Sequence, residues 1–227
     1  MSVTLYEMAG ANDLRFSPYC WRARMALAHK GITPERVGVR YTEKELIAFS
    51  GQGKVPILVD GDRAISDSWF IACHLEASYP DAPSLFGNAV GRGLSLYINT
   101  WADTRLNPLL MRLVLRDLVQ RVDPVDREYF QETRLQRLGT TFEALDAQHD
   151  ALLQKLREEL APMAQMLKQQ FWFGGEGPTY ADYIVFGTLL WARLASDEDL
   201  LDGQNEVRDW FAQLLELHDG LARNVTG

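Results

Sequence analysis

The chain has 227 residues, of which 47% are hydrophobic and 24% charged, and this fits one large folded domain or two smaller ones. The formal net charge is −8 without a block of five like charges, so we expect no nucleic-acid partner, because phosphate binding needs clustered Lys and Arg. Two cysteines, Cys20 and Cys73, are too few for a disulfide scaffold and favour a reducing, cytoplasmic setting. No basic region followed by an apolar run opens the sequence, and no apolar stretch approaches about 18 residues, so we expect neither a secretory signal nor contact with a membrane.

The first 80 residues predict a small α/β unit. Val3–Tyr6 is short, apolar and β-branched, which is typical of a buried strand. The further predicted elements are a helix from Ser17 to Gly31, a strand over Arg36–Tyr41, a short helix capped by Thr42 with Glu45 at the capping-box position, strands over Pro56–Val59 and Arg63–Ile65 joined by a tight turn at Asp60-Gly61-Asp62, and a helix from Asp67 to Tyr79. The order βαβαββα is too short for a doubly wound nucleotide-binding fold.

Residues Pro80–Gly93 are rich in Pro and Gly, and after them the pattern changes. From about Arg92 onward apolar residues recur at helical spacing and no strand is predicted. The predicted helices cover Leu94–Leu115 with a kink at Pro108, Pro124–Leu138, Ala151–Phe171, Tyr180–Ala195 and Glu206–Leu221. We therefore expect an α/β domain over residues 1–83, a linker over 84–92 and an all-helical domain over 93–227.

The stretch Ser17-Pro18-Tyr19-Cys20 opens the first helix and allows two interpretations. Ser is a preferred N-cap and Pro is preferred at the first helical position, so the motif can be purely structural. The same helix start offers free N–H groups and a positive dipole end, which would favour a bound thiolate that also receives a hydrogen bond from Ser17. Cys20 lies where a resolving cysteine would lie in a disulfide enzyme, but without a partner cysteine it is more typical of a small packing residue.

Two more motifs lie where strands meet loops. Pro56 begins a strand, a place where proline is tolerated, whereas a cis Val55–Pro56 bond would expose the Val55 backbone for pairing with an extended peptide. Asp67 and Ser68 open the next helix. Ser66 or Asp67 can be a plain N-cap, or the Asp67 carboxylate and the Ser68 hydroxyl can bind the ammonium and carboxylate of an α-amino acid.

Together and in this order, these motifs resemble the glutathione transferase family over nearly the whole chain. The N-terminal part resembles its thioredoxin-like glutathione domain, and the part from about residue 93 resembles its helical substrate domain. The stretch GPTYADYIVFGTLLWA adds to the resemblance, because Thr179 and Asp182 form a capping box with a structural role at this place in the family.

The resemblance implies glutathione as co-substrate. Ser17 would face the glutathione sulfur, with Tyr6 as a competing partner of the thiolate. The implied binding residues are Val55, before cis-Pro56, for the cysteinyl backbone, Asp67 and Ser68 for the γ-glutamyl end, and Lys54, with Lys44 as a weaker candidate, for the glycine carboxylate. The thiolate would attack an electrophilic carbon, and the implied quaternary structure is a twofold homodimer. No metal site is expected.

A narrower resemblance concerns SPYCWRARMALAHKG and DSWFIACHLEASYPDAPSLF, which are similar to the bacterial β-etherase branch and its fungal relatives. That branch cleaves β-aryl ethers, with glutathione displacing a phenol. An aromatic substrate pocket would be lined by Tyr19, Trp21, Tyr97 and Trp101, with Trp172 and Trp191 in the core. Two alternatives remain open: a protein that binds glutathione or an aromatic ligand without turnover, and a glutathione-dependent disulfide reductase that uses Cys20.

Overall fold

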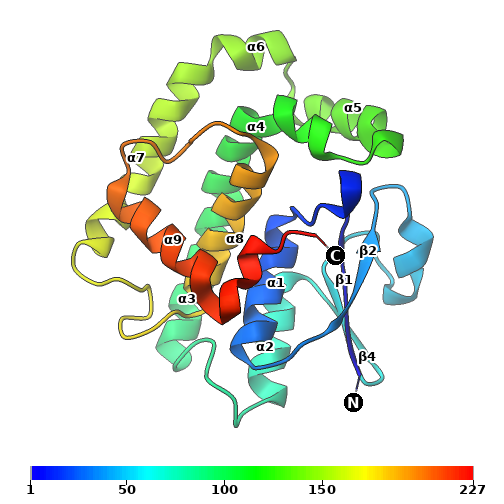
Figure 1. The fold of residues 1–227 in the computed structure, drawn as a ribbon, viewed down its shortest axis with the longest axis vertical. Helices are drawn as coiled ribbons and strands as arrows, with labels where there is room; N and C mark the ends of the chain where they lie inside the picture. The colour runs from blue at the N-terminus through cyan, green and yellow to red at the C-terminus, as the bar shows by residue number, and fades with distance from the viewer. Residues whose placement is uncertain (1, 227) are drawn as a thin grey trace.

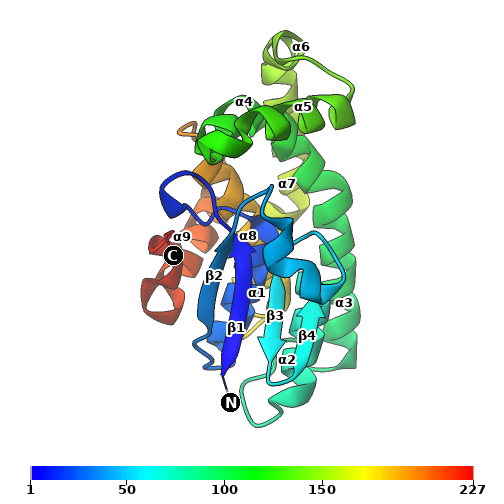
Figure 2. The ribbon, with the colours of Figure 1, turned by 90° about the vertical axis from the view of Figure 1, so that its right-hand side faces the viewer.

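The computed structural model describes residues 2–226, which form a four-stranded sheet with flanking helices followed by a helical bundle (Figure 1). The strands are β1 (Val3–Met8), β2 (Glu35–Val39), β3 (Ile57–Asp60) and β4 (Arg63–Ser66), in the order β2-β1-β3-β4. β1 and β2 are parallel and the other pairs antiparallel. Figure 2 shows the four strands side by side, with α1 (Pro18–His29) and α2 (Ser68–Ser78) behind them.

The side chains on the two faces of β1 pack into two different hydrophobic cores, because successive side chains of a strand point to opposite faces. Leu5 is buried in the large core beneath α1. Tyr6 packs against a second, small cluster of Val39, Ile47 and Ile57. The thioredoxin-like order of strands and helices is thus as the sequence predicts.

The segment after β2 differs from its prediction. A 3₁₀ helix, η2 (Lys44–Ser50), begins after Glu43 without a side-chain cap. The Thr42 hydroxyl does not cap it but donates a 2.6 Å hydrogen bond to the Asp126 carboxylate, which comes from the helical half. The predicted capping box at Thr42 and Glu45 is therefore wrong, because a distant carboxylate competes for the threonine hydroxyl.

The second half is helical, as predicted. Its helices are α3 (Ala89–Trp101), α4 (Asn107–Arg121), α5 (Arg127–Leu138), α6 (Phe142–Ala147), α7 (His149–Leu167), α8 (Tyr180–Ala195) and α9 (Asn205–Gly220). α3 begins inside the predicted linker, and the short α6 was not predicted. A π-helical segment, η3 (Ala102–Leu106), ends two residues before Pro108, whose ring nitrogen cannot donate a helical hydrogen bond.

Helix α8 joins the two halves, since it lies against α1 in the centre of the molecule (Figure 1). Thr179 and Asp182 form the predicted capping box at its start. A Cβ at Gly187 would lie 2.7 Å from the Pro18 carbonyl oxygen. Glycine at this position therefore lets α8 approach the first turn of α1. None of the helices within residues 2–226 has both the length and the apolar character required to cross a bilayer.

Candidate functional site

The ends of three strands bring the predicted glutathione-binding residues to one edge of the sheet. Tyr6 of β1 pairs with Ile57 of β3, and Ile57 pairs with Ser66 of β4. The last residues of β1, the first of β3 and the last of β4 therefore share an edge. Val55-Pro56 directly precedes β3 and Asp67-Ser68 directly follows β4. Because α1 connects the parallel strands β1 and β2, its start, with Ser17, lies at this same edge.

Ser17 is the N-cap of α1, and Pro18 occupies the first helical position. The serine oxygen accepts a hydrogen bond from the Cys20 N–H at 3.4 Å, and the residue is 8% exposed. The structural interpretation of the motif is thus confirmed. The Ser17 hydroxyl also acts as a hydrogen-bond partner that lowers the pKa of the Cys20 thiol, so it lies within reach of a sulfur atom and can donate its proton to an anion.

Cys20 is a core residue in this structure. It is 2% exposed, and its sulfur accepts a 3.4 Å hydrogen bond from the Met8 N–H. Burial, together with the charge of Glu7, raises the pKa of the Cys20 thiol to about 12, against the opposing hydrogen bond with Ser17. The thiol is therefore protonated and poorly nucleophilic at neutral pH.

The Val55–Pro56 peptide bond is cis, and nearby Asp67 has a positive φ angle. The Asp67 N–H donates to the Pro56 carbonyl oxygen at 3.4 Å, which joins the two loops. Asp67 has φ +75° and ψ 132°, a region that residues with a side chain rarely occupy. Its exposed carboxylate caps α2 by accepting the Trp69 N–H at 2.8 Å. Of the two candidate caps, Asp67 is the one observed.

The remaining predicted binding residues differ in exposure. Ser68 is 2% exposed, and its carbonyl accepts a 2.7 Å hydrogen bond from the Tyr180 hydroxyl. Lys54 and Lys44 are both exposed. A Cβ at Gly53 would lie 3.6 Å from the Lys44 side chain, so the two lysines belong to adjoining segments. The edge thus carries one exposed carboxylate and two exposed ammonium groups.

The ring of Tyr6, the competing candidate for contact with the sulfur, lies on the small cluster beneath η2. Its centre is 5.2 Å from that of Phe49. Because Leu5 faces α1 and Tyr6 faces away from it, the geometry favours Ser17 over Tyr6.

Trp21 belongs to the core and not to a substrate pocket, which corrects the prediction for this residue. It has no exposed surface, and its indole N–H donates to the Arg15 carbonyl oxygen at 2.6 Å. The Arg24 guanidinium lies 4.0 Å above its ring. The reason is that α1 is covered by the sheet on one side and by α8 on the other.

Tyr19 is only half-buried and lies at the junction of the two halves. Its hydroxyl accepts a 3.1 Å hydrogen bond from the amide of Asn107, at the start of α4. The Arg22 guanidinium lies 4.7 Å from the centre of its ring. Burial, followed by the charge of Asp103, raises the pKa of Tyr19, so that its side chain is a neutral phenol at physiological pH.

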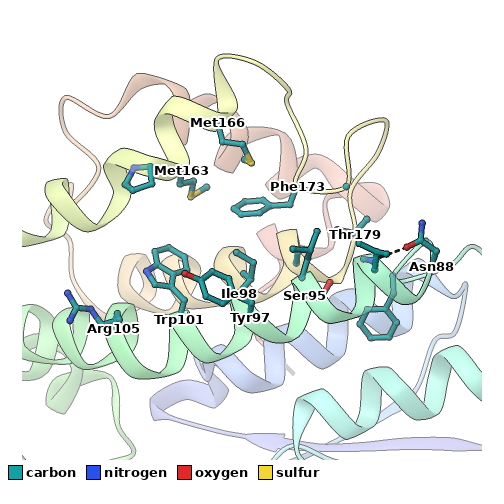
Figure 3. A pocket seen from close by; sticks show the side chains of 18 of the residues that line it. Asn88, Ser95, Tyr97, Ile98, Trp101, Arg105, Met163, Met166, Phe173 and Thr179 are labelled. Atoms are coloured by element: carbon teal, nitrogen blue, oxygen red, sulfur yellow. Dashed lines mark hydrogen bonds between the residues drawn. The ribbon is translucent and has the colours of Figure 1, made fainter.

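Tyr97 and Trp101 line a different space, a cleft of about 1020 Å³ between α3 and α7. Figure 3 shows both rings and Met163, Met166 and Phe173 around it. The Trp101 indole N–H donates to Glu159 at 2.6 Å. The residues that line this cleft include none of the predicted glutathione ligands and neither Tyr19 nor Trp21. The four aromatic residues therefore do not form one pocket.

Two further tryptophans, Trp172 and Trp191, were expected in the core. Trp191 is 3% exposed, and Trp172 is partly buried against the same core. Within residues 2–226 no three side chains of His, Cys, Asp or Glu are grouped as metal ligands.

The sequence interpretation missed the contact between Asn107 and Tyr19. The Asn107 amide also donates to Asp103 at 3.2 Å, and Asp103 forms a 2.9 Å ion pair with the fully buried Arg22. The one signal in the sequence is the Asn107-Pro108 pair, which interrupts an otherwise apolar helical pattern.

Two family models match this chain. A model of the glutathione S-transferase N-terminal domain matches residues 16–78, and a model of the glutathione S-transferase C-terminal domain matches residues 94–219. A zeta-class glutathione S-transferase of Euphorbia esula is 30% identical over 112 residues, which are 47% of this chain and half of that protein. A stringent starvation protein A homolog of Pasteurella multocida is 25% identical, over 87% of this chain and 81% of that protein.

Solved structures show the same fold. Glutathione transferase GSTFuA3 of Phanerochaete chrysosporium superposes with a TM-score of 0.78 at 23% identity, over 97% of this chain and 92% of that one. A glutathione S-transferase of Ceriporiopsis subvermispora, solved in complex with glutathione, gives a TM-score of 0.79 at 22% identity, over 96% of this chain and 97% of that one.

Proposed function

Because the chain belongs to the glutathione S-transferase family, we propose that it binds glutathione at the sheet edge formed by Ser17, Val55-Pro56 and Asp67-Ser68 and transfers it to an aromatic electrophile. The observation that carries this proposal is the Ser17 hydroxyl at the start of α1, where the positive end of the helix dipole favours an anion. Glutathione is the co-substrate of this family, and its sulfur would lie at this hydroxyl.

The chemistry requires a thiolate at neutral pH. A free thiol with a pKa of about 8.5 is only about 3% ionised at pH 7, and a pKa of about 6.5 makes most of it thiolate. A shift of about 2 units corresponds to roughly 2.7 kcal/mol of preference for the anion. The N–H groups and dipole of α1 and a hydrogen bond from Ser17 supply energies of this order. The thiolate then attacks an electrophilic carbon held beside it.

The rest of glutathione would extend along the same edge. The Val55 backbone N–H and C=O would pair with the cysteinyl residue, as an added strand does. The exposed Asp67 carboxylate would meet the ammonium of the γ-glutamyl group, and Ser68 at the start of α2 its carboxylate. Lys54, with Lys44 beside it, would receive the glycine carboxylate.

For the electrophile we propose an aryl ether that releases a phenol. The motifs around Ser17 and Ser68 support this class through their similarity to the β-etherase branch. The half-buried Tyr19 provides an aromatic surface next to Ser17. Disulfide reduction through Cys20 is the less favoured alternative, because that thiol is buried and protonated. The free state of both cysteines agrees with a reducing, cytoplasmic setting.

Replacement of Ser17 by Ala tests the proposal. We expect the turnover of model aryl ethers and halonitrobenzenes with glutathione to fall about 100-fold, because the thiolate loses its hydrogen-bond donor, while calorimetry shows a change in glutathione affinity below about threefold. A protein that takes up glutathione but turns over neither substrate class would be a binding protein.

Two control variants separate this effect from structural damage. Thr141→Ala removes the N-cap of α6 and is expected to lower stability by about 1 kcal/mol, as the loss of the Ser17 cap does, without changing turnover. Cys20→Ala is expected to keep transferase turnover within about twofold. Full activity of Ser17→Ala, or loss of all activity in Cys20→Ala, would refute the assignment of Ser17.

We also propose that the protein is a homodimer that covers the outer face of α3. Val90, Leu94 and Tyr97 recur at positions i, i+4 and i+7 of this helix and are 71%, 62% and 69% exposed. Phe70, on α2, is 63% exposed. An apolar stripe of this kind favours a protein partner over solvent, and a second copy offers the same stripe. The cleft between α3 and α7 would then belong to the dimer interface and not to the electrophile site.

Replacement of Leu94 by Glu tests the dimer. We expect light scattering to give twice the mass of the chain for the wild-type protein and the mass of one chain for Leu94→Glu, because a buried carboxylate without a partner is strongly unfavourable. Glu132→Ala, on α5 and outside this cleft, also changes the charge of one exposed residue and should remain dimeric. A monomeric wild-type protein at micromolar concentration would disprove this interface.

A further inference from the structure

The Tyr19 hydroxyl forms an unusual hydrogen bond that fixes the direction of its proton. The Asn107 amide nitrogen lies 3.1 Å from the Tyr19 oxygen and 3.2 Å from Asp103 Oδ1. A carboxylate only accepts, so the NH₂ group of Asn107 faces Asp103 and donates to both oxygens. Tyr19 is therefore the acceptor in this contact, and its own proton points elsewhere.

This arrangement is held from several sides. Asp103 accepts from Arg22 at 2.9 Å, and Arg22 is fully buried and also donates to Thr188 of α8 at 3.0 Å. Asn107 is 9% exposed, and its carbonyl oxygen is buried without a hydrogen-bond partner among the described residues. A buried carbonyl oxygen without a hydrogen-bond partner lowers the stability of the fold, so the presence of asparagine here indicates a role for its NH₂ group.

The Tyr19 side chain also lies near the proposed sulfur position. Tyr19 is two residues after Ser17, and side chains in the first turn of a helix lean toward its N-terminus. The carboxylate of Asp67, at the same edge of the sheet, is near enough to contribute to the raised pKa of Tyr19. The phenol is thus protonated and half-buried, and its proton has no acceptor among residues 2–226.

We propose that Tyr19 is a catalytic hydrogen-bond donor to the leaving oxygen of the aryl ether, and that Asn107 is the positioning residue that aims its proton. This inference rests on the proposed function and specifies its substrate as an electrophile with an oxygen leaving group. The sulfur lone pair forms the C–S bond, and the C–O bond breaks with both electrons on the aryl oxygen. Tyr19 donates a hydrogen bond to that oxygen and keeps its proton. The released phenolate takes a proton from solvent, which has already received the thiol proton.

The dependence of rate on the leaving phenol tests the donor. A hydrogen bond to the leaving oxygen matters most when that oxygen carries most charge and is most basic. Tyr19→Phe keeps the ring over which Arg22 lies and removes only the hydroxyl. We expect the kcat of this variant to fall about 10- to 100-fold for an aryl ether that releases unsubstituted phenol. For an ether that releases 4-nitrophenol, the fall should be less than about threefold. Glutathione affinity should remain unchanged.

Asn107→Asp tests the direction of the proton. A carboxylate at this position accepts from Tyr19, so it would withdraw the proton from the substrate and reproduce the leaving-group dependence of Tyr19→Phe. The double variant Tyr19→Phe/Asn107→Asp should then be no slower than Tyr19→Phe alone, since both changes remove the same interaction. A purely structural role of Asn107 would give additive losses instead.

Tyr79→Phe is the matched control, because its hydroxyl has a structural partner, Asp60, at 3.0 Å. Tyr79→Phe should lower stability without changing the slope of log kcat against the pKa of the leaving phenol. An equal loss for every ether in Tyr19→Phe, or no loss, would overturn the inference. If the wild-type protein cleaves none of the ethers, the donor role of Tyr19 fails, whereas calorimetric binding of glutathione and turnover of halonitrobenzenes would show that the Ser17 proposal survives.

Discussion

The backbone of Asp67 is held in a conformation that is unfavourable for a residue with a side chain, at φ +75°. Such backbone strain persists where the surrounding structure imposes it, and it concentrates at ligand-binding sites. Here the Asp67 N–H is tied to the Pro56 carbonyl and its carboxylate to the Trp69 N–H. One carboxylate oxygen is used by the helix cap, and the exposed side chain presents the other to solvent.

Replacement of Asp67 by Asn separates its role as the N-cap of α2 from its role as a negative charge for the bound ligand. Asn is as good an N-cap as Asp, so we expect the free energy of unfolding to change by less than about 0.5 kcal/mol. Glutathione affinity, measured by calorimetry, should fall about tenfold because the charge that meets its ammonium group is lost. Unchanged affinity would show that the γ-glutamyl group binds elsewhere.

At the scale of a single element, α8 depends on one buried carboxylate. Asp182 has no exposed surface and accepts from the Thr179 N–H at 2.8 Å, the Phe173 N–H at 3.0 Å and the Trp210 indole at 3.0 Å. Burial raises its pKa, and these hydrogen bonds oppose that shift. The carboxylate thus fixes the start of α8 and joins it to α9 and to the preceding loop.

Replacement of Asp182 by Ala should lower the free energy of unfolding by about 3 kcal/mol, measured by denaturant titration. The change leaves four donors without their acceptor, the fully buried Trp210 indole and three groups on the partly buried residues Phe173 and Thr179, at an average cost of a little under about 1 kcal/mol each. Thr141→Ala, which removes one exposed N-cap, is the comparison variant and should lower the free energy of unfolding by about 1 kcal/mol. Equal losses for the two variants would mean that the buried cap is not central to stability.

At the scale of the whole molecule, a histidine cluster joins the two halves. His29, at the end of α1, lies 2.7 Å from the Tyr183 hydroxyl of α8, which in turn lies 3.3 Å from His218 of α9. The other His29 nitrogen lies 3.1 Å from the Ser84 carbonyl oxygen and must donate to it. Both contacts fit a neutral imidazole.

This cluster makes stability depend on pH. Burial, and then the charge of His218, lowers the pKa of His29 below 6.5, with Lys30 acting in the same direction and Glu76 opposing. The unfolded chain therefore binds more protons than the folded one just below pH 6.5, so the contribution of His29 is complete above that pH and is lost as the pH falls.

We expect the stability advantage of the wild-type protein over His29→Gln to shrink between pH 7 and pH 5, by at most about 1.4 kcal/mol per unit. Denaturant titrations of both proteins across this range measure it, and the difference between them removes the contributions of the carboxylates. A constant difference would mean that His29 does not titrate in this window.

Local rules determined much of the architecture from the sequence alone. The order of strands and helices, the Ser17 cap, the Asp67 cap and the Thr179–Asp182 capping box each depend on residues within a few positions of one another, and all of them appear in the structure. The prediction failed at Thr42, where Asp126 competes for the hydroxyl from 84 residues away. It also missed α6, whose six residues are too few for a clear helical period.

Only the tertiary structure decided which side chains meet. Trp21 and Tyr19 are two residues apart on one helix, yet the first is fully buried and the second only half-buried, because α1 has a sheet on one side and α8 on the other. Periodicity cannot resolve faces on a helix that is buried nearly all around. The contact of Tyr19 with Asn107 spans 88 residues of sequence. The sequence by itself thus determined the elements and the mouth of α1, whereas the packing of the two halves decided which aromatic residue lies beside Ser17.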